Sequence, residues 1–118
     1  MPARGVVLDP RALAALSDLV GGDPEAITEV VQAFLQDAPD RLAEIRTGLA
    51  GDDLELVRRA AHTLKTNGLT FGAQGFATAC TELERTAKLG ELDAATALAA
   101  DVERAWDGAR PAIEKLGA

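Results

Sequence analysis

Residues 23–53 read DPEAITEVVQAFLQDAPDRLAEIRTGLAGDD, and this stretch decides the fold class. Asp23 before Pro24 is a typical helix start, because aspartate caps free backbone N–H groups and proline fits the first helical turn. Apolar residues then recur at spacings of three and four, at Ile27, Val30, Val31, Phe34, Ala38, Leu42, Ile45 and Leu49. The stretch therefore predicts one long amphipathic helix that ends at Gly51, with Pro39 kinking it but not ending it.

Start and stop signals divide the rest of the chain into helices as well. The expected helices run from Pro10 to Val20, from Pro24 to Gly51, from Asp53 into the glycine-rich stretch 68–75, from there to about Leu89, and from Glu91 towards Leu116. Strand signals are nearly absent. Four long helices joined by short turns predict an all-α, antiparallel up-down four-helix bundle, with the short additional N-terminal helix packed over one end as a lid.

Length and composition narrow the class of protein. A chain of 118 residues is expected to form one domain, 1–118, and it contains no run of about 18 apolar residues that could span a membrane. Its N-terminus is too short and too quickly charged for a secretory signal, and the single Cys80 fits a reducing compartment. The net charge of −7 argues against nucleic acid as a partner. We expect a cytoplasmic monomer that binds neither membranes nor nucleic acid.

The only histidine, His62, lies in the helix that starts at Asp53, and a helical wheel turns it outward. The apolar residues of this helix gather on the opposite side, at Leu54, Val57, Ala60, Leu64, Gly68 and Phe71. The neighbours of His62 one turn away are Arg58, Arg59, Lys65 and Thr66. An exposed imidazole among cations is better explained as a nucleophile whose surroundings can receive an anion than as a packing residue.

Residues 61–72 read AHTLKTNGLTFG. Leu64 lies two residues after His62, Lys65 three and Gly72 ten residues after it. This spacing resembles the signature of histidine-containing phosphotransfer (HPt) domains, in which an aliphatic residue, a lysine and a glycine follow the phosphorylated histidine at these positions. The resemblance implies that His62 is the phosphoacceptor and that Lys65 stabilises the phosphoryl group.

Two other segments extend the resemblance over most of the chain. Residues 34–39, FLQDAP, look like the proline-bearing second helix of HPt domains, and residues 80–84, CTELE, look like their fourth helix. The chain departs from the family at Thr66 and Asn67, where many members carry glycine and another small residue. Thr66 lies one turn above the histidine on the same face, so it narrows access to the ring, while its hydroxyl could hydrogen-bond a phosphoryl oxygen.

The resemblance implies a phosphocarrier intermediate that has no nucleotide site of its own and is not an enzyme. A phosphoryl group would pass from a receiver-domain aspartate of a hybrid histidine kinase to Nε2 of His62, and then to a response regulator in a multistep phosphorelay. The receiver domains would supply the magnesium ion, so no metal or cofactor is expected in this chain. Residues expected to contact the phosphoryl group or the partner are Arg58, Arg59, Thr66 and Leu69, and residues expected to be structural are Leu64, Gly68 and Gly72.

Other chemistries lack the residues that they need. One histidine and one cysteine far apart do not make a zinc site, and no Glu-x-x-His pair suggests a di-iron bundle. Two alternatives stay open: a four-helix scaffold that binds a receiver or another signalling partner without accepting phosphate, and a phosphoacceptor domain phosphorylated by a chemotaxis-type kinase. The start at Met1 and the absence of linkers suggest a stand-alone protein, with an excised domain of a larger kinase as the alternative.

Overall fold

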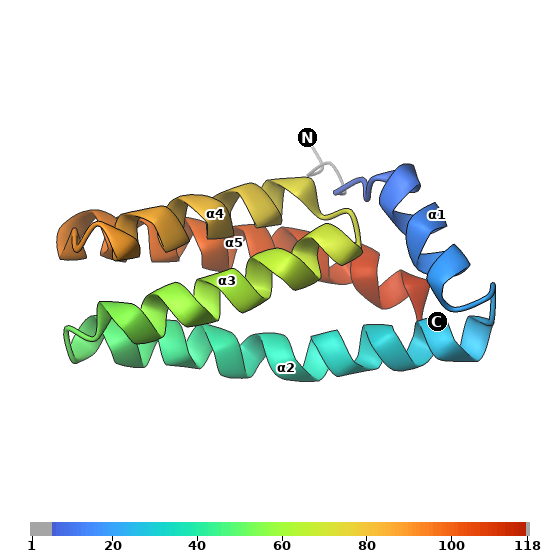
Figure 1. Cartoon of the computed structure of the whole chain (residues 1–118), viewed down its shortest axis with the longest axis horizontal. Coiled ribbons are helices and arrows are strands. Elements are labelled where there is room, and N and C mark those ends of the chain that lie inside the picture. The colour runs from blue at the N-terminus through green and yellow to red at the C-terminus, as the bar shows by residue number, and fades with distance from the viewer. Residues whose placement is uncertain (1–5, 118) are drawn as a thin grey trace.

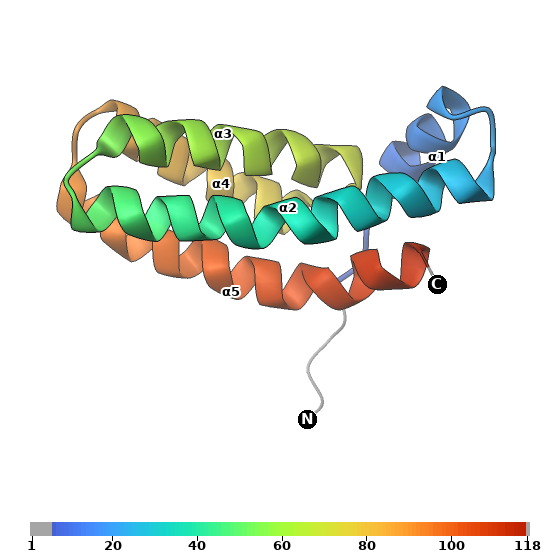
Figure 2. The ribbon, with the colours of Figure 1, turned by 90° about the horizontal axis from the view of Figure 1, so that it is seen from below.

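The computed structural model describes residues 6–117 and contains five α-helices and no strand within that range. The helices are α1 (Pro10–Leu19), α2 (Pro24–Ala50), α3 (Leu54–Thr70), α4 (Gln74–Lys88) and α5 (Leu92–Leu116). Helices α2 to α5 run up and down beside one another, and α1 lies at one end of the bundle (Figure 1). The view from below shows α5 on the side of the bundle away from α3 (Figure 2). The predicted all-α, antiparallel four-helix bundle with a short N-terminal helix is confirmed.

Three aspartates start the first three helices, as the sequence signals predict. The side chain of Asp9 accepts a hydrogen bond from the Arg11 N–H, that of Asp23 from the Glu25 N–H, and that of Asp53 from the Leu56 N–H. Each carboxylate thereby satisfies one of the free N–H groups of a first helical turn. Helix α2 continues through Pro39 for a further eleven residues, so proline does not end it. None of the helices within residues 6–117 is both long and apolar enough to cross a membrane.

All four aromatic side chains of the protein gather in one cluster inside the bundle. Phe34 stacks on Phe71 with ring centroids 5.2 Å apart, and the edge of Trp106 meets Phe34 at 5.1 Å. Phe76 completes the cluster at 5.5 Å from Trp106. These contacts join α2, α4, α5 and the end of α3.

The turn between α3 and α4 depends on two close approaches at glycine. A Cβ atom at Gly68 would lie 2.9 Å from the Phe76 ring, so the absence of a side chain lets α3 and α4 pack closely. Gly72 has a φ of +69°, and a Cβ atom there would lie 2.6 Å from the Asp9 backbone nitrogen. That nitrogen donates a hydrogen bond of 2.9 Å to the Gly72 carbonyl. Because Gly72 has no side chain, the residue before α1 packs against the turn and forms this hydrogen bond with it.

Candidate functional site

His62 lies on the exposed side of α3, and its side chain is 55% exposed. The opposite side of the helix is buried through Val57, Ala60, Leu64 and Gly68, which the wheel places there. Leu54 is only partly buried, and Ala61 is fully buried although it lies outside the predicted stripe. The reason is that α3 packs against both α2 and α4, so its buried face is wider than a single apolar stripe.

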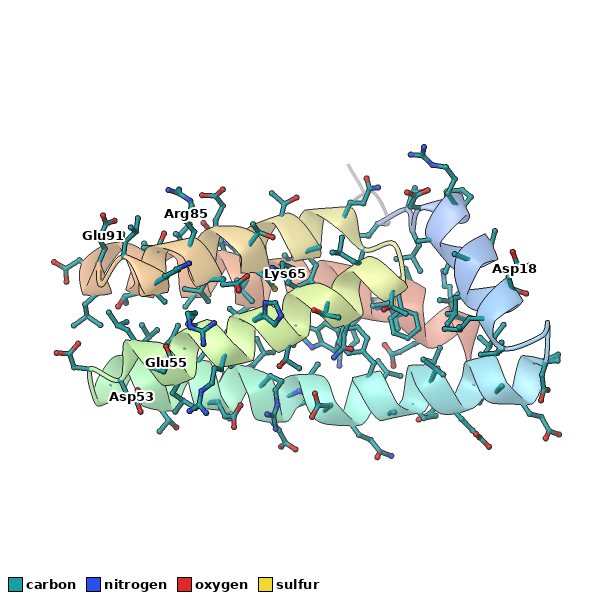
Figure 3. The ribbon with its side chains drawn as sticks, in the orientation of Figure 1. Asp18, Asp53, Glu55, Lys65, Arg85 and Glu91 are labelled. Carbon is teal, nitrogen blue, oxygen red and sulfur yellow. The ribbon has the colours of Figure 1, made fainter. Side chains whose placement is uncertain are left out.

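Glu84 on α4 binds two residues of α3 at once. Its Oε2 atom lies 2.8 Å from Nδ1 of His62, and its Oε1 atom accepts a hydrogen bond of 2.7 Å from the Lys65 ammonium group. Lys65 lies between the two helices (Figure 3). Only 18% of the Glu84 side chain is exposed. Burial raises the pKa of Glu84, but the hydrogen bonds from Lys65 and His62 outweigh that effect and hold the pKa below its ordinary value. Glu84 is therefore ionised at neutral pH.

An ionised carboxylate beside Nδ1 decides which nitrogen of His62 can react. A carboxylate only accepts hydrogen bonds, so in the neutral ring the proton sits on Nδ1 and points at Glu84. The lone pair that remains belongs to Nε2. When Nε2 acts as a nucleophile the ring becomes positively charged, and the same carboxylate stabilises that charge. The geometry leaves Nε2 as the ring nitrogen with a free lone pair, on a ring that Glu84 orients through Nδ1.

The two arginines before His62 lie on different sides of α3. Arg58 forms a two-pronged hydrogen bond with Glu55, from Nε to Oε2 at 2.9 Å and from Nη2 to Oε1 at 2.5 Å. Arg59 instead lines a groove between α2 and α3 together with Glu44, and no ion pair within residues 6–117 involves it. The cations predicted to surround the histidine are thus divided: Lys65 binds Glu84, Arg58 lies within reach of the charge of Glu84, and Arg59 lies at the groove between α2 and α3.

Thr66 and Leu69, the remaining predicted contact residues, lie further along the exposed face. The Thr66 hydroxyl donates a hydrogen bond of 3.1 Å to the His62 carbonyl within α3, so it must rotate before it can donate to a phosphoryl oxygen. Leu69 is 54% exposed and borders a groove of about 210 Å³ whose other walls come mainly from α1, including Leu16 and Leu19. The short N-terminal helix therefore adds an apolar surface next to the histidine helix.

Sequence reasoning missed Glu84 as a site residue, although a signal for it exists. Residues 80–84 were recognised only for their resemblance to a family helix. In an antiparallel pair of helices, residues at equal distances from the turn lie opposite each other. The turn is centred on Gly72, which lies ten residues after His62 and twelve residues before Glu84, so these two positions lie nearly opposite each other. Within the described residues, no group of three His, Cys, Asp or Glu side chains is placed to hold a metal ion.

Comparisons with known proteins agree with this geometry. The family model described as Hpt domain matches residues 29–112, a range that contains His62, Lys65 and Glu84. The crystal structure of histidine-containing phosphotransfer protein B (HptB) from Pseudomonas aeruginosa PAO1 is similar to this chain, with a TM-score of 0.82 and 30% sequence identity over 92% of this chain and 91% of that chain. No curated protein sequence matches significantly. Since the family model covers most of the chain and the structural similarity extends along nearly all of it, this chain belongs to the Hpt domain family of histidine phosphotransfer proteins.

Proposed function

We propose that this protein carries a phosphoryl group on Nε2 of His62 between receiver-domain aspartates of a hybrid histidine kinase and of a response regulator in a multistep phosphorelay. The observation that carries the proposal is an exposed imidazole whose Nδ1 lies 2.8 Å from the ionised carboxylate of Glu84. Membership of the Hpt family supports a phosphocarrier role.

The transfer step follows from the hydrogen bond between His62 and Glu84. The Nε2 lone pair attacks the phosphorus atom of the aspartyl phosphate, the N–P bond forms as the O–P bond breaks, and the aspartate carboxylate leaves. The ring keeps its proton on Nδ1 and becomes positively charged beside Glu84. In the second transfer a carboxylate oxygen of the next receiver attacks the phosphorus atom, and Nε2 leaves as a neutral imidazole. A magnesium ion held by each receiver would neutralise charge on the phosphoryl oxygens.

Lys65 supports this step in two ways. Its ammonium group lies 2.7 Å from Glu84 Oε1, which keeps the carboxylate ionised and oriented towards the ring. It also brings a positive charge to the helical turn that follows His62, where it favours an incoming phosphoryl group. The side chains of His62, Lys65 and Glu84 therefore act as one unit in the proposed function.

The decisive experiment is phosphoryl transfer from a radiolabelled phospho-receiver to the wild-type protein and to the His62→Gln variant. Label on the wild type alone, labile in acid and stable in base, is the expected result, because phosphohistidine has that stability whereas aspartyl phosphate is labile in base. Binding of receivers without label on either form would favour a scaffold. Label that appears only with a kinase domain and ATP would favour a phosphoacceptor domain of the chemotaxis type.

A further inference from the structure

Arg58, which lies one helical turn before His62, is already bound to a carboxylate of its own helix. Both prongs of its guanidinium group meet Glu55, at 2.9 and 2.5 Å. Glu55 lies near the start of α3 (Figure 3) and is exposed, whereas Arg58 is partly buried. A planar guanidinium group binds a phosphoryl group with the same pair of N–H donors that here bind Glu55. The two anions therefore cannot both be bound in this way.

Two observations place Arg58 within reach of a phosphoryl group on His62. It lies four residues before His62, and residues at this spacing are neighbours on a helix surface. Helical side chains lean towards the N-terminus of their helix, which is the direction of Arg58 from His62. The pKa of Arg58 is raised first by the hydrogen bond to Glu55, and the charge of Glu84 contributes as well. Arg58 is thus within electrostatic reach of the carboxylate that binds the His62 ring.

We propose that Glu55 binds Arg58 while His62 is unphosphorylated and gives Arg58 up when a phosphoryl group is attached to Nε2. Glu55 then competes with the phosphoryl group for one guanidinium group, and this competition weakens retention of the phosphoryl group on His62. The inference rests on the proposed function of His62 as the phosphoacceptor. Glu55 is a positioning residue in this scheme, because it acts through Arg58 and touches neither the ring nor the phosphoryl group.

The relative strengths of the two interactions make such an exchange feasible. An exposed Glu–Arg pair on one helix contributes little to stability, so little is lost when it opens. A phosphoryl group carries nearly twice the charge of a carboxylate and presents more acceptor oxygens. The phosphoryl group therefore displaces Glu55 from Arg58. The loss of the Glu55–Arg58 pair still reduces the free energy gained when Arg58 binds the phosphoryl group. The phosphoryl group must be passed on to a second protein. Because Glu55 competes for Arg58 and so weakens retention of the phosphoryl group on His62, the transfer stays reversible.

The test is a pH titration of the phosphoryl group by phosphorus NMR, on protein phosphorylated with phosphoramidate, a small phosphoryl donor. A bound guanidinium group favours the dianion, so it lowers the proton affinity of the phosphoryl group. The Glu55→Gln variant frees Arg58, and we expect the proton affinity to fall about 2- to 5-fold relative to wild type.

A matched control is Glu82→Gln. Glu82 forms an i,i+3 pair with Arg85 at 2.9 Å, and Arg85 lies on the side of α4 away from α3 (Figure 3). We expect this variant to titrate like the wild type. Equal titration of wild type, Glu55→Gln and Glu82→Gln would overturn the inference.

The Arg58→Gln background separates competition from a simple field effect. Glu55→Gln is expected to have no effect in that background, because the guanidinium group for which the two anions compete is gone. An effect that persists there would mean that Glu55 acts by its charge alone, and it would overturn the inference. Label from phosphoramidate but from no phospho-receiver would contradict the proposed function only. If neither phosphoramidate nor a phospho-receiver labels His62, both the proposed function and this inference are contradicted.

Discussion

The exposed side of α3 has two parts that differ in how they are built. Around His62 the side chains are polar and are joined to one another, since Glu84 binds both His62 and Lys65 and Glu55 binds Arg58. Around Leu69 the surface is apolar and is shaped by the packing of α1, without ion pairs among the side chains that form the groove. Around His62, hydrogen bonds hold the side-chain atoms in fixed positions, whereas the surface around Leu69 provides apolar area. The difference separates a place suited to chemistry from a place suited to recognition of a partner.

The substitution expected to have the largest effect on the polar part around His62 is Glu84→Ala. Without the carboxylate the His62 ring loses its fixed orientation and the group that keeps the proton on Nδ1. We expect the rate of phosphoryl transfer to His62 to fall about 10- to 100-fold, a loss of the size seen when the carboxylate that orients a metal-binding imidazole is removed. The measurement is single-turnover transfer from a phospho-receiver.

Two further variants sharpen this test. Glu84→Gln keeps an acceptor for the Nδ1 proton but lacks the charge, so its rate should lie between those of Glu84→Ala and wild type. Glu82→Ala changes the same helix at a residue that pairs with Arg85, and it should transfer at the wild-type rate. A Glu84→Ala protein as fast as wild type would mean that the hydrogen bond to the ring has no role in transfer.

The apolar part is tested by Leu69→Ala. Leu69 is 54% exposed, so its truncation should leave the fold intact and remove apolar area from the surface that we expect to contact a partner. We expect the affinity for a receiver domain to fall about 5-fold, from roughly 1 kcal/mol of lost burial. The rate of phosphorylation by phosphoramidate should not change. Leu89→Ala is the matched control. Leu89 is 60% exposed and directly follows the C-terminal end of α4, whereas Leu69 lies near the turn that precedes α4. Equal loss of affinity in both variants would argue against a specific role of the groove.

The smallest expected effect is on stability as a function of pH. The pKa of Glu84 is lower in the folded protein than its ordinary value of 4.5, because the hydrogen bonds from Lys65 and His62 outweigh burial. The unfolded chain therefore binds a proton more readily, so this stabilisation is complete above the ordinary value and is lost as pH falls through the lowered pKa. Urea unfolding of wild type and Glu84→Gln from neutral to acidic pH should show a difference in stability that shrinks on acidification. A difference that grows towards low pH would contradict the assignment of an ionised Glu84.

The fold could be predicted from the sequence because its signals are local. The aspartates before α1, α2 and α3 cap them at the predicted positions, and the wheel of α3 already turns His62 outward. Glu84 was not predicted as a site residue, because its contacts depend on the alignment of α3 against α4. The apolar periodicity of a single helix carries no information about that alignment. The different surroundings of Arg58 and Arg59 have the same origin, since α4 flanks one side of α3 and α2 the other. The apolar groove at Leu69 required the position of α1 as well.

Because one carboxylate contacts two positions of α3, the Glu84 bridge also reports the register of α3 against α4. His62 and Lys65 are three residues apart, which corresponds to a rise of about 4.5 Å along the helix axis. An axial slip of one turn, about 5.4 Å, would carry the His62 ring away from the carboxylate. The hydrogen bond that orients the His62 ring therefore requires the correct register of α3 on α4, and a molecule that folds with α3 out of register would also lack the proposed preparation of its histidine.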